Sequence, residues 1–227
     1  MTAAVRVWIA PAELSPDEEA RCRRVLDAGE RARAAALASM PDRRRFTLAH
    51  AALRMLAGRE LGAPPEALAW TSGRHGKPVL TAPRAGLHTN LSHSNGFIAV
   101  AVSHARPVGV DVQLLVPGLD TAGISARFFP PGEAAYVAAG GDAGVRADRF
   151  ARLWVRKEAV VKAAGGRLWP NLSIAVHPGD LVDCAEPAGW HRVAEITAPA
   201  GYRAAVALAG EAPYAVDVSD WPGVTGG

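Results

Sequence analysis

The segment Phe97-Ile-Ala-Val-Ala-Val-Ser-His-Ala-Arg-Pro-Val-Gly-Val-Asp-Val-Gln113 contains two strand-like stretches separated by a short break. Residues 97–102 are apolar on both faces of a strand, which predicts a central, buried strand. Residues 108–113 alternate valine with glycine, aspartate and glutamine, which predicts a second strand with one valine face and one polar face. We expect two halves of the chain to meet at the break, near residue 105.

Working outward to the N-terminus, helical patterns give way to strand-like ones. Residues 5–9 predict a short strand, and Ser15 with Glu18 matches a capping box that opens a helix reaching the late thirties. Pro41 and Asp42 mark the start of a second helix. Beyond that helix, period-two alternation predicts strands over residues 67–71, 87–91 and 97–103.

The second half repeats this order of strand, helices and further strands. After the strand over residues 108–113, we expect helices over residues 121–127, 131–139 and 147–164. Further strands are expected near Leu172 and Val193 and over residues 202–208 and 214–218. The predicted fold class is α+β, with two similar pseudo-symmetric halves, residues 1–105 and 106–227, and the active site in the cleft between them.

Length and composition narrow the class of protein. The 227 residues are 49% hydrophobic, which suffices for a buried core. No run of roughly 18 apolar residues is present, and the N-terminal segment lacks the features of a secretory signal. Cys22 and Cys184 show neither metal-ligand spacing nor a disulfide pattern. We therefore expect a cytoplasmic protein that does not act on a membrane.

Charge is distributed unevenly along the chain. Residues 1–105 carry 14 basic and 9 acidic side chains, whereas residues 106–227 carry 11 and 13. A polyanionic ligand is thus expected to meet the first half, although a solvated arginine-rich helix surface gives the same count. The pI near 9.2 would also suit a nucleic-acid binder, but only 6% of residues are aromatic and no nucleic-acid-binding motif is recognisable.

The polar face of the strand over residues 108–113 has the chemistry of a metal site. Strand alternation places Gly109, Asp111 and Gln113 on one side. A carboxylate and a carboxamide oxygen are ligands that suit a hard cation such as Mg²⁺, and the glycine leaves room beside them. An edge strand with a polar outer face explains the same pattern.

The helix expected over residues 147–164 carries charged residues beside an apolar stripe. Glu158 and Lys162 lie one turn apart on the flank of the stripe, where they could reach a cleft walled by Trp154 or form a surface ion pair. Lys157 falls near the middle of the stripe. For Lys157 we favour a structural lysine, snorkelling or paired, over a catalytic one.

Five segments together resemble the signatures of the 4′-phosphopantetheinyl transferase superfamily, and the length is similar to that of its broad-specificity, Sfp-type branch. In chain order they are Gly76-Lys-Pro78, Asn90-Leu-Ser-His-Ser94, Gly109-Val-Asp111, Arg127-Phe-Phe-Pro-Pro-Gly-Glu133 and Trp154-x-x-Lys-Glu-Ala-x-x-Lys162. The resemblance covers roughly residues 40 to 175. It departs from the family pattern at Gln113, where the family often has a second carboxylate.

The resemblance implies particular site residues. Asp111 and Glu158 would bind Mg²⁺, or Mn²⁺ in its place, with Gln113 as a weak or water-mediated contact. Asp111, Glu158 and Lys162 would be catalytic, with Lys162 against the pyrophosphate of coenzyme A. The remaining coenzyme A contacts would be Arg45, Lys77, Ser92 and His93. Arg43 and Arg44 adjoin Arg45, and helical phase alone does not choose among the three.

The resemblance also implies the reaction. The phosphopantetheine arm of coenzyme A would pass to a serine of an apo acyl- or peptidyl-carrier protein, and 3′,5′-ADP would leave. Coenzyme A and carrier proteins are thus the expected partners, with no nucleic acid and no membrane, and two fused halves suggest a monomer. An alternative hypothesis is a protein that binds coenzyme A but has lost the transferase activity. The hypothesis arises because Gln113 stands where the family often has a carboxylate. Retention of Asp111, Glu158 and Lys162 argues against it.

Overall fold

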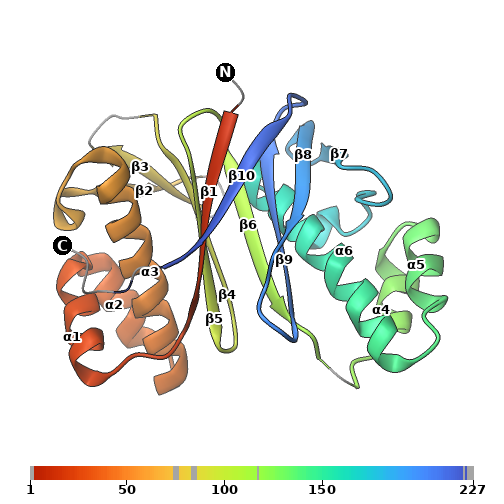
Figure 1. The fold of residues 1–227 in the computed structure, drawn as a ribbon, viewed down its shortest axis with the longest axis horizontal. Coiled ribbons are helices and arrows are strands. Elements are labelled where there is room, and N and C mark those ends of the chain that lie inside the picture. Colours follow the sequence, from red (N-terminus) through yellow and green to blue (C-terminus); the bar gives the residue numbers. More distant parts are fainter. Residues whose placement is uncertain (1–2, 74–76, 83–85, 117, 222, 224–227) are drawn as a thin grey trace.

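Two four-stranded sheets occupy the centre of the molecule, and helices cover their outer sides (Figure 1). This arrangement is seen in a computed structural model that describes residues 3–73, 77–82, 86–116, 118–221 and 223. The predicted α+β class is confirmed. Gly76, the first residue of the Gly-Lys-Pro segment, lies outside the described residues.

The first sheet has the strand order β10-β1-β5-β4. Its strands are β10 (Tyr214–Asp220), β1 (Ala3–Pro11), β5 (Phe97–Ser103) and β4 (His88–Ser94). α3 (Met40–Leu61) packs on this sheet, and α1 (Pro16–Val25) and α2 (Ala28–Ala36) pack against α3. A 3-10 helix (Pro65–Ala67) leads to a two-stranded sheet of β2 (Ala69–Ser72) and β3 (Pro78–Ala82).

The second sheet has the strand order β6-β9-β8-β7, with every neighbouring pair antiparallel. Its strands are β6 (Val108–Leu114), β7 (Leu181–Ala185), β8 (Ala188–Ile196) and β9 (Tyr202–Ala209). The helices on this side are α4 (Thr121–Phe128), α5 (Pro131–Ala138) and α6 (Ala143–Ala164), followed by a 3-10 helix (Trp169–Asn171).

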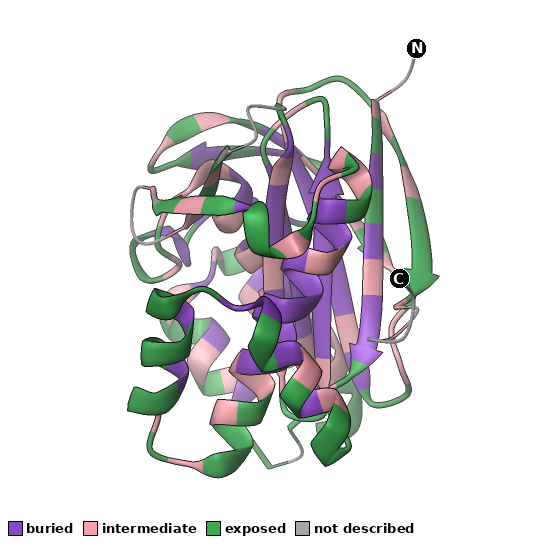
Figure 2. Ribbon diagram, turned by 90° about the vertical axis from the view of Figure 1, so that its left-hand side faces the viewer, coloured by how far each residue is buried: buried purple, intermediate pink, exposed green. Residues whose placement is uncertain are grey.

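The segment over residues 97–113 forms β5 and β6, as predicted. From Ile98 to Ser103 every residue of β5 is buried, which confirms a central strand. The buried strands run through the middle of Figure 2, with exposed residues on the helices and loops around them. Both faces of β6 are buried as far as Val112, so its polar residues do not face open solvent as an exposed outer face would.

The helix expected from Ser15 to the late thirties is two helices. Ser15 forms the predicted capping box with Glu18 at the start of α1. The chain then leaves the helical conformation at Leu26, and Asp27 with Glu30 makes a second capping box that opens α2. Because Asp27 satisfies the first amides of a new helix, the break costs little free energy.

Gly109 allows β6 to lie directly against α6. A Cβ atom at this position would be 2.1 Å from the carbonyl oxygen of Ala159 and 2.4 Å from the amide nitrogen of Ala163. Both atoms belong to the backbone of a helix, so they could move aside only if the helix moved. The absence of a side chain at Gly109 therefore holds Asp111, two residues on, close to α6.

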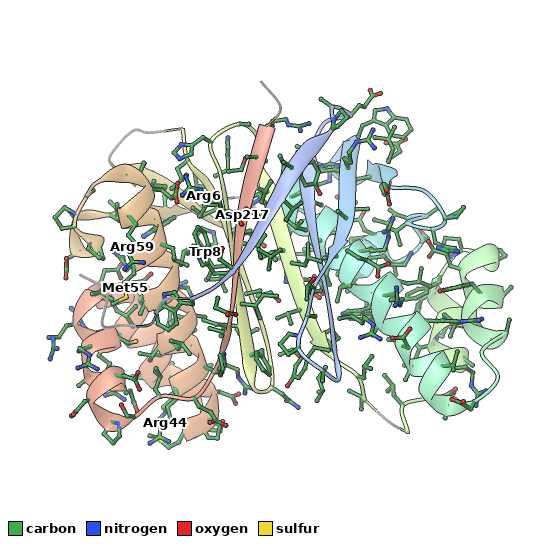
Figure 3. All side chains as sticks on the ribbon, in the orientation of Figure 1. Arg6, Trp8, Arg44, Met55, Arg59 and Asp217 are labelled. Carbon is green, nitrogen blue, oxygen red and sulfur yellow. The ribbon has the colours of Figure 1, made fainter. Side chains whose placement is uncertain are left out.

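The C-terminal strand joins the sheet of the first half. β10 pairs in parallel with β1, in a register that sets Asp217 opposite Arg6 (Figure 3). On the neighbouring α3, Arg44, Met55 and Arg59 lie in that order from its lower end upward. The division into residues 1–105 and 106–227 stays a prediction, and within it β10 crosses back to the first sheet.

The prediction of a strand near Leu172 is wrong. The residues that follow alternate in burial as a strand would, but their backbone groups are bonded to side chains instead of a neighbouring strand. The amide of Val176 donates to Glu133 Oε1 at 2.5 Å, and the carbonyl of Ile174 accepts from Lys157 Nζ. A segment whose backbone is satisfied in this way needs no strand partner.

In the part of the chain that the structure describes, no helix combines the length and the apolar character needed to cross a membrane.

Candidate active site

Three side chains from three elements meet where β4 and β6 face each other. Lys162 Nζ of α6 lies 2.6 Å from Asp111 Oδ1 of β6 and 3.0 Å from Ser92 Oγ of β4. The Ser92 hydroxyl donates to the same Asp111 oxygen at 2.7 Å. Asp111 and Ser92 are buried, whereas the Lys162 side chain is about a quarter exposed, at 26%. A carboxylate, a hydroxyl and an ammonium group thus share one partly open site.

Two carboxylates at this site are not fully compensated by hydrogen bonds or by positive charge. Asp111 Oδ2 is buried and has no hydrogen-bond partner. Burial raises the pKa of Glu158, the Lys162 charge opposes this shift, and the Asp111 charge reinforces it. Because the Asp111 charge acts on Glu158, a cation bound near both carboxylates would oppose the shift at Glu158.

The structure brings Gln113 to the edge of this cluster but gives its amide another partner. Gln113 Nε2 donates to the carbonyl of Leu114 at 3.2 Å. Among the described residues, no group of three or more His, Cys, Asp or Glu side chains could hold a metal ion. Any cation here would therefore rely on Asp111 and Glu158 and take its other ligands from Gln113, a substrate or water.

Lys77 reaches the site region from the first half, and its ammonium is engaged with backbone. Nζ donates to the carbonyls of Lys162 at 2.6 Å, Val108 at 3.1 Å and Ala163 at 3.3 Å. Two of these carbonyls end α6, where a positive charge is favoured. Burial lowers the pKa of Lys77 to about 8. In this structure Lys77 connects the segment before β3 with β6 and the end of α6, and little of its ammonium is left for a ligand.

Of the three consecutive arginines at the start of α3, Arg45 is the one beside His93. Its guanidinium pairs with Asp42 and donates to the carbonyl of Asn95 at 3.0 Å, in the turn after β4. Arg43 and Arg44 instead bond to the carbonyl of Leu37 and to Glu19, away from that turn.

His93 is an exposed residue with positively charged side chains near it. Desolvation, and then the charges of Arg45 and Lys162, lower the pKa of His93. His50 adds a further, smaller contribution of the same sign. An anion bound beside His93 would be stabilised by the charges of Arg45 and Lys162.

An apolar cavity of about 350 Å³ begins at Gln113. Trp154, one turn before Glu158 on α6, forms part of its wall, and Phe128 and Trp169 form another part. The Trp169 side chain is exposed, at 70%, although a large aromatic residue is normally covered. The cavity is thus bordered by Gln113 and Trp154, which lie two and four residues along the chain from Asp111 and Glu158.

The sequence assigned no role to Asn90, Ser94 or Glu133, although all three lie within the motifs. Asn90 and Ser94 hydrogen-bond to β6, and Glu133 forms a buried ion pair with Lys157 at 2.6 Å. For Asn90 and Ser94 the sequence pattern did indicate a shared surface, because both lie on the same face of a strand as Ser92. The pairing of Glu133 with Lys157 has no such signal.

Comparison with known proteins gives a consistent result. The sequence model of the 4′-phosphopantetheinyl transferase superfamily matches residues 107–209. The 4′-phosphopantetheinyl transferase HetI of Nostoc sp. is 30% identical over 91% of this chain and 88% of its own length. The match thus extends over both sheets.

Two further relatives cover less of the chain. A putative 4′-phosphopantetheinyl transferase of Synechocystis sp. is 31% identical over 70% of this chain and 64% of its own length. The 4′-phosphopantetheinyl transferase AcpT of Escherichia coli K12 is 36% identical over 53% of this chain and 62% of its own length.

Proposed function

Since the chain belongs to the 4′-phosphopantetheinyl transferase superfamily and is an enzyme of that class, we propose that it takes the arm from coenzyme A, depends on Mg²⁺, and modifies a serine of an apo acyl- or peptidyl-carrier protein. The observation that carries this proposal is the cluster of Asp111, Glu158 and Lys162. Action as a monomer in the cytoplasm stays a prediction from the sequence.

The residues of the cluster fit a divalent ion. The second oxygen of Asp111 has no hydrogen-bond partner, and burial raises the pKa of Glu158, so both carboxylates would gain from a bound cation. Asp111 and Glu158 would hold Mg²⁺, with Gln113 as a neutral neighbour. When bound, the ion would neutralise charge on the pyrophosphate and on the leaving phosphate.

The side chains of this protein account for the remaining steps. The carrier serine oxygen forms a bond to the β-phosphorus, on the pantetheine side, and the bond from that phosphorus to the bridging oxygen of 3′,5′-ADP breaks. Lys162, which meets Asp111 at 2.6 Å, would stabilise the charge that develops on the phosphate oxygens. Glu158, directly or through a water molecule, would accept the serine proton.

The nucleotide would lie toward the first half and the arm toward the apolar cavity. Arg45 would supply positive charge for the 3′-phosphate beside His93, and Ser92, the residue before His93, is bonded to Asp111. Lys77 was expected to contact the nucleotide, and its bonds to three carbonyls support a smaller part in binding. The cavity beside Gln113 has the apolar lining that the methyl groups and methylenes of pantetheine require.

Incubation with an apo carrier protein, coenzyme A and Mg²⁺, followed by intact mass measurement, tests the function. The carrier should gain one phosphopantetheine, and 3′,5′-ADP should appear in equal amount. Removal of divalent ions with a chelator should stop the reaction. Binding of coenzyme A without any mass gain, across a panel of apo carriers, would instead favour the binding protein without turnover.

The 3′-phosphate contact can be tested with dephospho-coenzyme A. We expect wild-type protein to bind dephospho-coenzyme A more weakly than coenzyme A by roughly 1–3 kcal/mol, because charge-assisted contacts are lost. In His93→Ala this preference should shrink, as measured by calorimetry with both ligands. His104→Ala serves as the control, since His104 pairs with Glu60 on the surface. An undiminished preference in His93→Ala would remove His93 from the site.

Gln113 should matter far less than Asp111. Its amide is already bonded to the carbonyl of Leu114, and a neutral carboxamide binds Mg²⁺ less strongly than a carboxylate. We expect Gln113→Ala to retain most of the activity, and Gln113→Glu to lower the Mg²⁺ concentration that gives half-maximal rate. Magnesium titrations of the three proteins measure both effects. If Gln113→Ala were as inactive as Asp111→Ala, a site with two carboxylates would be the wrong description.

A further inference from the structure

β6, the strand that carries Asp111, is an edge strand of its sheet. β4 is likewise an edge strand, but of the other sheet, and the two edges face each other. An edge strand leaves alternate backbone amides and carbonyls without partners in its own sheet. In a buried strand these groups must be satisfied in another way.

Side chains of β4 satisfy the amides along this edge. The amide of Val110 donates to Asn90 Oδ1 at 2.9 Å, and the amide of Leu114 donates to Ser94 Oγ at 3.1 Å. Between them the amide of Val112 lies 3.5 Å from Ser92 Oγ, a longer contact. The three rungs are Asn90 to Val110, Ser92 to Val112 and Ser94 to Leu114, each two residues from the next. We call them the β4–β6 ladder.

Two lysines satisfy the carbonyls of the same edge. Lys77 Nζ donates to the carbonyl of Val108 at 3.1 Å, and Lys162 Nζ lies 3.3 Å from the carbonyl of Val110. The edge of β6 is thus held by side chains on both its donors and its acceptors. Because a side chain of fixed length reaches only the amide opposite it, a ladder of three rungs also fixes the register of the two strands.

We propose that Asn90 and Ser94 are positioning residues, which set the register of β6 against β4 so that Asp111 meets Ser92 and Lys162. They act through the backbone of β6 and need not touch the substrate. Displacing Asp111 by one residue would turn its side chain to the opposite face of the strand. Smaller shifts would separate the groups around the reacting phosphate, where small misplacements are costly. The catalytic consequence rests on the proposed function, whereas the ladder itself does not.

A rival explanation is that Asn90 contacts the ligand directly. Asn90 borders a cavity of about 170 Å³ that Arg33 and His50 also line. A lost ligand contact would raise KM for coenzyme A. A misplaced Asp111 would lower kcat and leave KM nearly unchanged, because Arg45 and His93 belong to the first sheet and its helices.

The test combines amide hydrogen exchange by NMR in the free protein with steady-state kinetics. In Asn90→Ala we expect the Val110 amide to exchange at least about tenfold faster, because it loses its acceptor. We also expect kcat to fall on the order of tenfold, with KM for coenzyme A within about twofold of wild type. Ser94→Ala should act in the same way on the Leu114 amide, with a smaller fall in kcat. Ser94→Thr keeps the hydroxyl and should restore both.

Ser103→Ala is the matched control. It removes a buried hydroxyl of the neighbouring strand β5 that accepts from the amides of Ala105 and Arg106 at 3.2 and 3.5 Å, outside the ladder. It should leave kcat and the exchange of Val110 unchanged.

The outcomes separate the ladder from the proposed function. Unchanged exchange at Val110 and Leu114 in the alanine variants would overturn the ladder whatever the activity. Faster exchange with normal kcat, or an equal fall in kcat in Ser103→Ala, would overturn the positioning role. Should Asn90→Ala fail to fold, Ser94→Ala and Ser94→Thr carry the test, since Ser94 is only half-buried. If the wild-type protein had no transferase activity, only the proposed function would be wrong. The exchange data would still show whether the β4–β6 ladder exists.

Discussion

Asp111→Ala and Glu158→Ala are each expected to slow carrier modification by about 10² to 10³-fold while the protein stays folded. Each variant removes one of the two anionic groups that would hold the divalent ion, and Asp111 is also the group that meets Lys162 at 2.6 Å. Asp111→Ala also removes the bonds of Oδ1 to Lys162 and Ser92, but the Lys162 side chain is 26% exposed, so water can solvate its ammonium group. Loss of Glu158 removes a carboxylate whose burial is unfavourable, since burial raises its pKa. Activity should therefore fall far more than stability.

The measurement is the rate of phosphopantetheine transfer over a range of Mg²⁺ concentrations, with circular dichroism as the test of folding. Asp183→Ala is the control, because Asp183 is an exposed carboxylate on β7 in the same sheet. It should keep wild-type rates. Near-normal turnover of either Asp111→Ala or Glu158→Ala at saturating Mg²⁺ would rule out the assignment of that residue to the metal.

Some features of the site followed from local sequence patterns. Strand alternation placed Asp111 and Gln113 on one face, and helical spacing placed Glu158 and Lys162 one turn apart. The meeting of Asp111 with Lys162 across 51 residues, and with Ser92 across 19, depends on how β4, β6 and α6 pack. No local sequence pattern indicates such packing. Only the resemblance of the combined motifs to a family indicated that these residues would meet.

The same limit explains which parts of the fold were predicted. The capping box of Ser15 and Glu18 correctly predicted the start of α1. The sequence also contains a second capping box, Asp27 with Glu30, which marks the start of α2 and was missed. The parallel pairing of β10 with β1 is set by contacts between the two ends of the chain. Alternation can predict that residues 214–218 form a strand, but it says nothing of which strand lies beside them.

Lys157 shows how packing decides between two interpretations that sequence left open. Its side chain is completely buried, at 0% exposed, and lies 2.6 Å from Glu133 Oε2. Nζ also lies 4.6 Å from the centre of the Phe129 ring and donates to the carbonyl of Ile174. Lys157 is thus a paired structural lysine, as favoured from the sequence, while the adjacent Glu158 turns toward the site.

Lys157→Met is therefore expected to destabilise the protein by about 3–5 kcal/mol, because it leaves the Glu133 carboxylate buried without its partner. The melting temperature should fall on the order of 10 °C. In the double variant Lys157→Met with Glu133→Gln, most of this loss should be recovered. The glutamine oxygen can still accept from the amide of Val176, and no buried charge remains. Thermal and urea unfolding of wild type, both single variants and the double variant give the coupling between the two residues.

Arg152→Met is the control, since Arg152 lies on the same helix and forms its ion pairs with Asp148 and Glu195 at the surface. It should cost less than about 1 kcal/mol. If Lys157→Met were no more destabilising than Arg152→Met, the pair would contribute nothing to stability. A large loss of transfer rate in a stable Lys157→Met protein would then return this lysine to the candidate catalytic residues. The expected result is the reverse, with unfolding at lower temperature and a rate per folded molecule close to that of wild type.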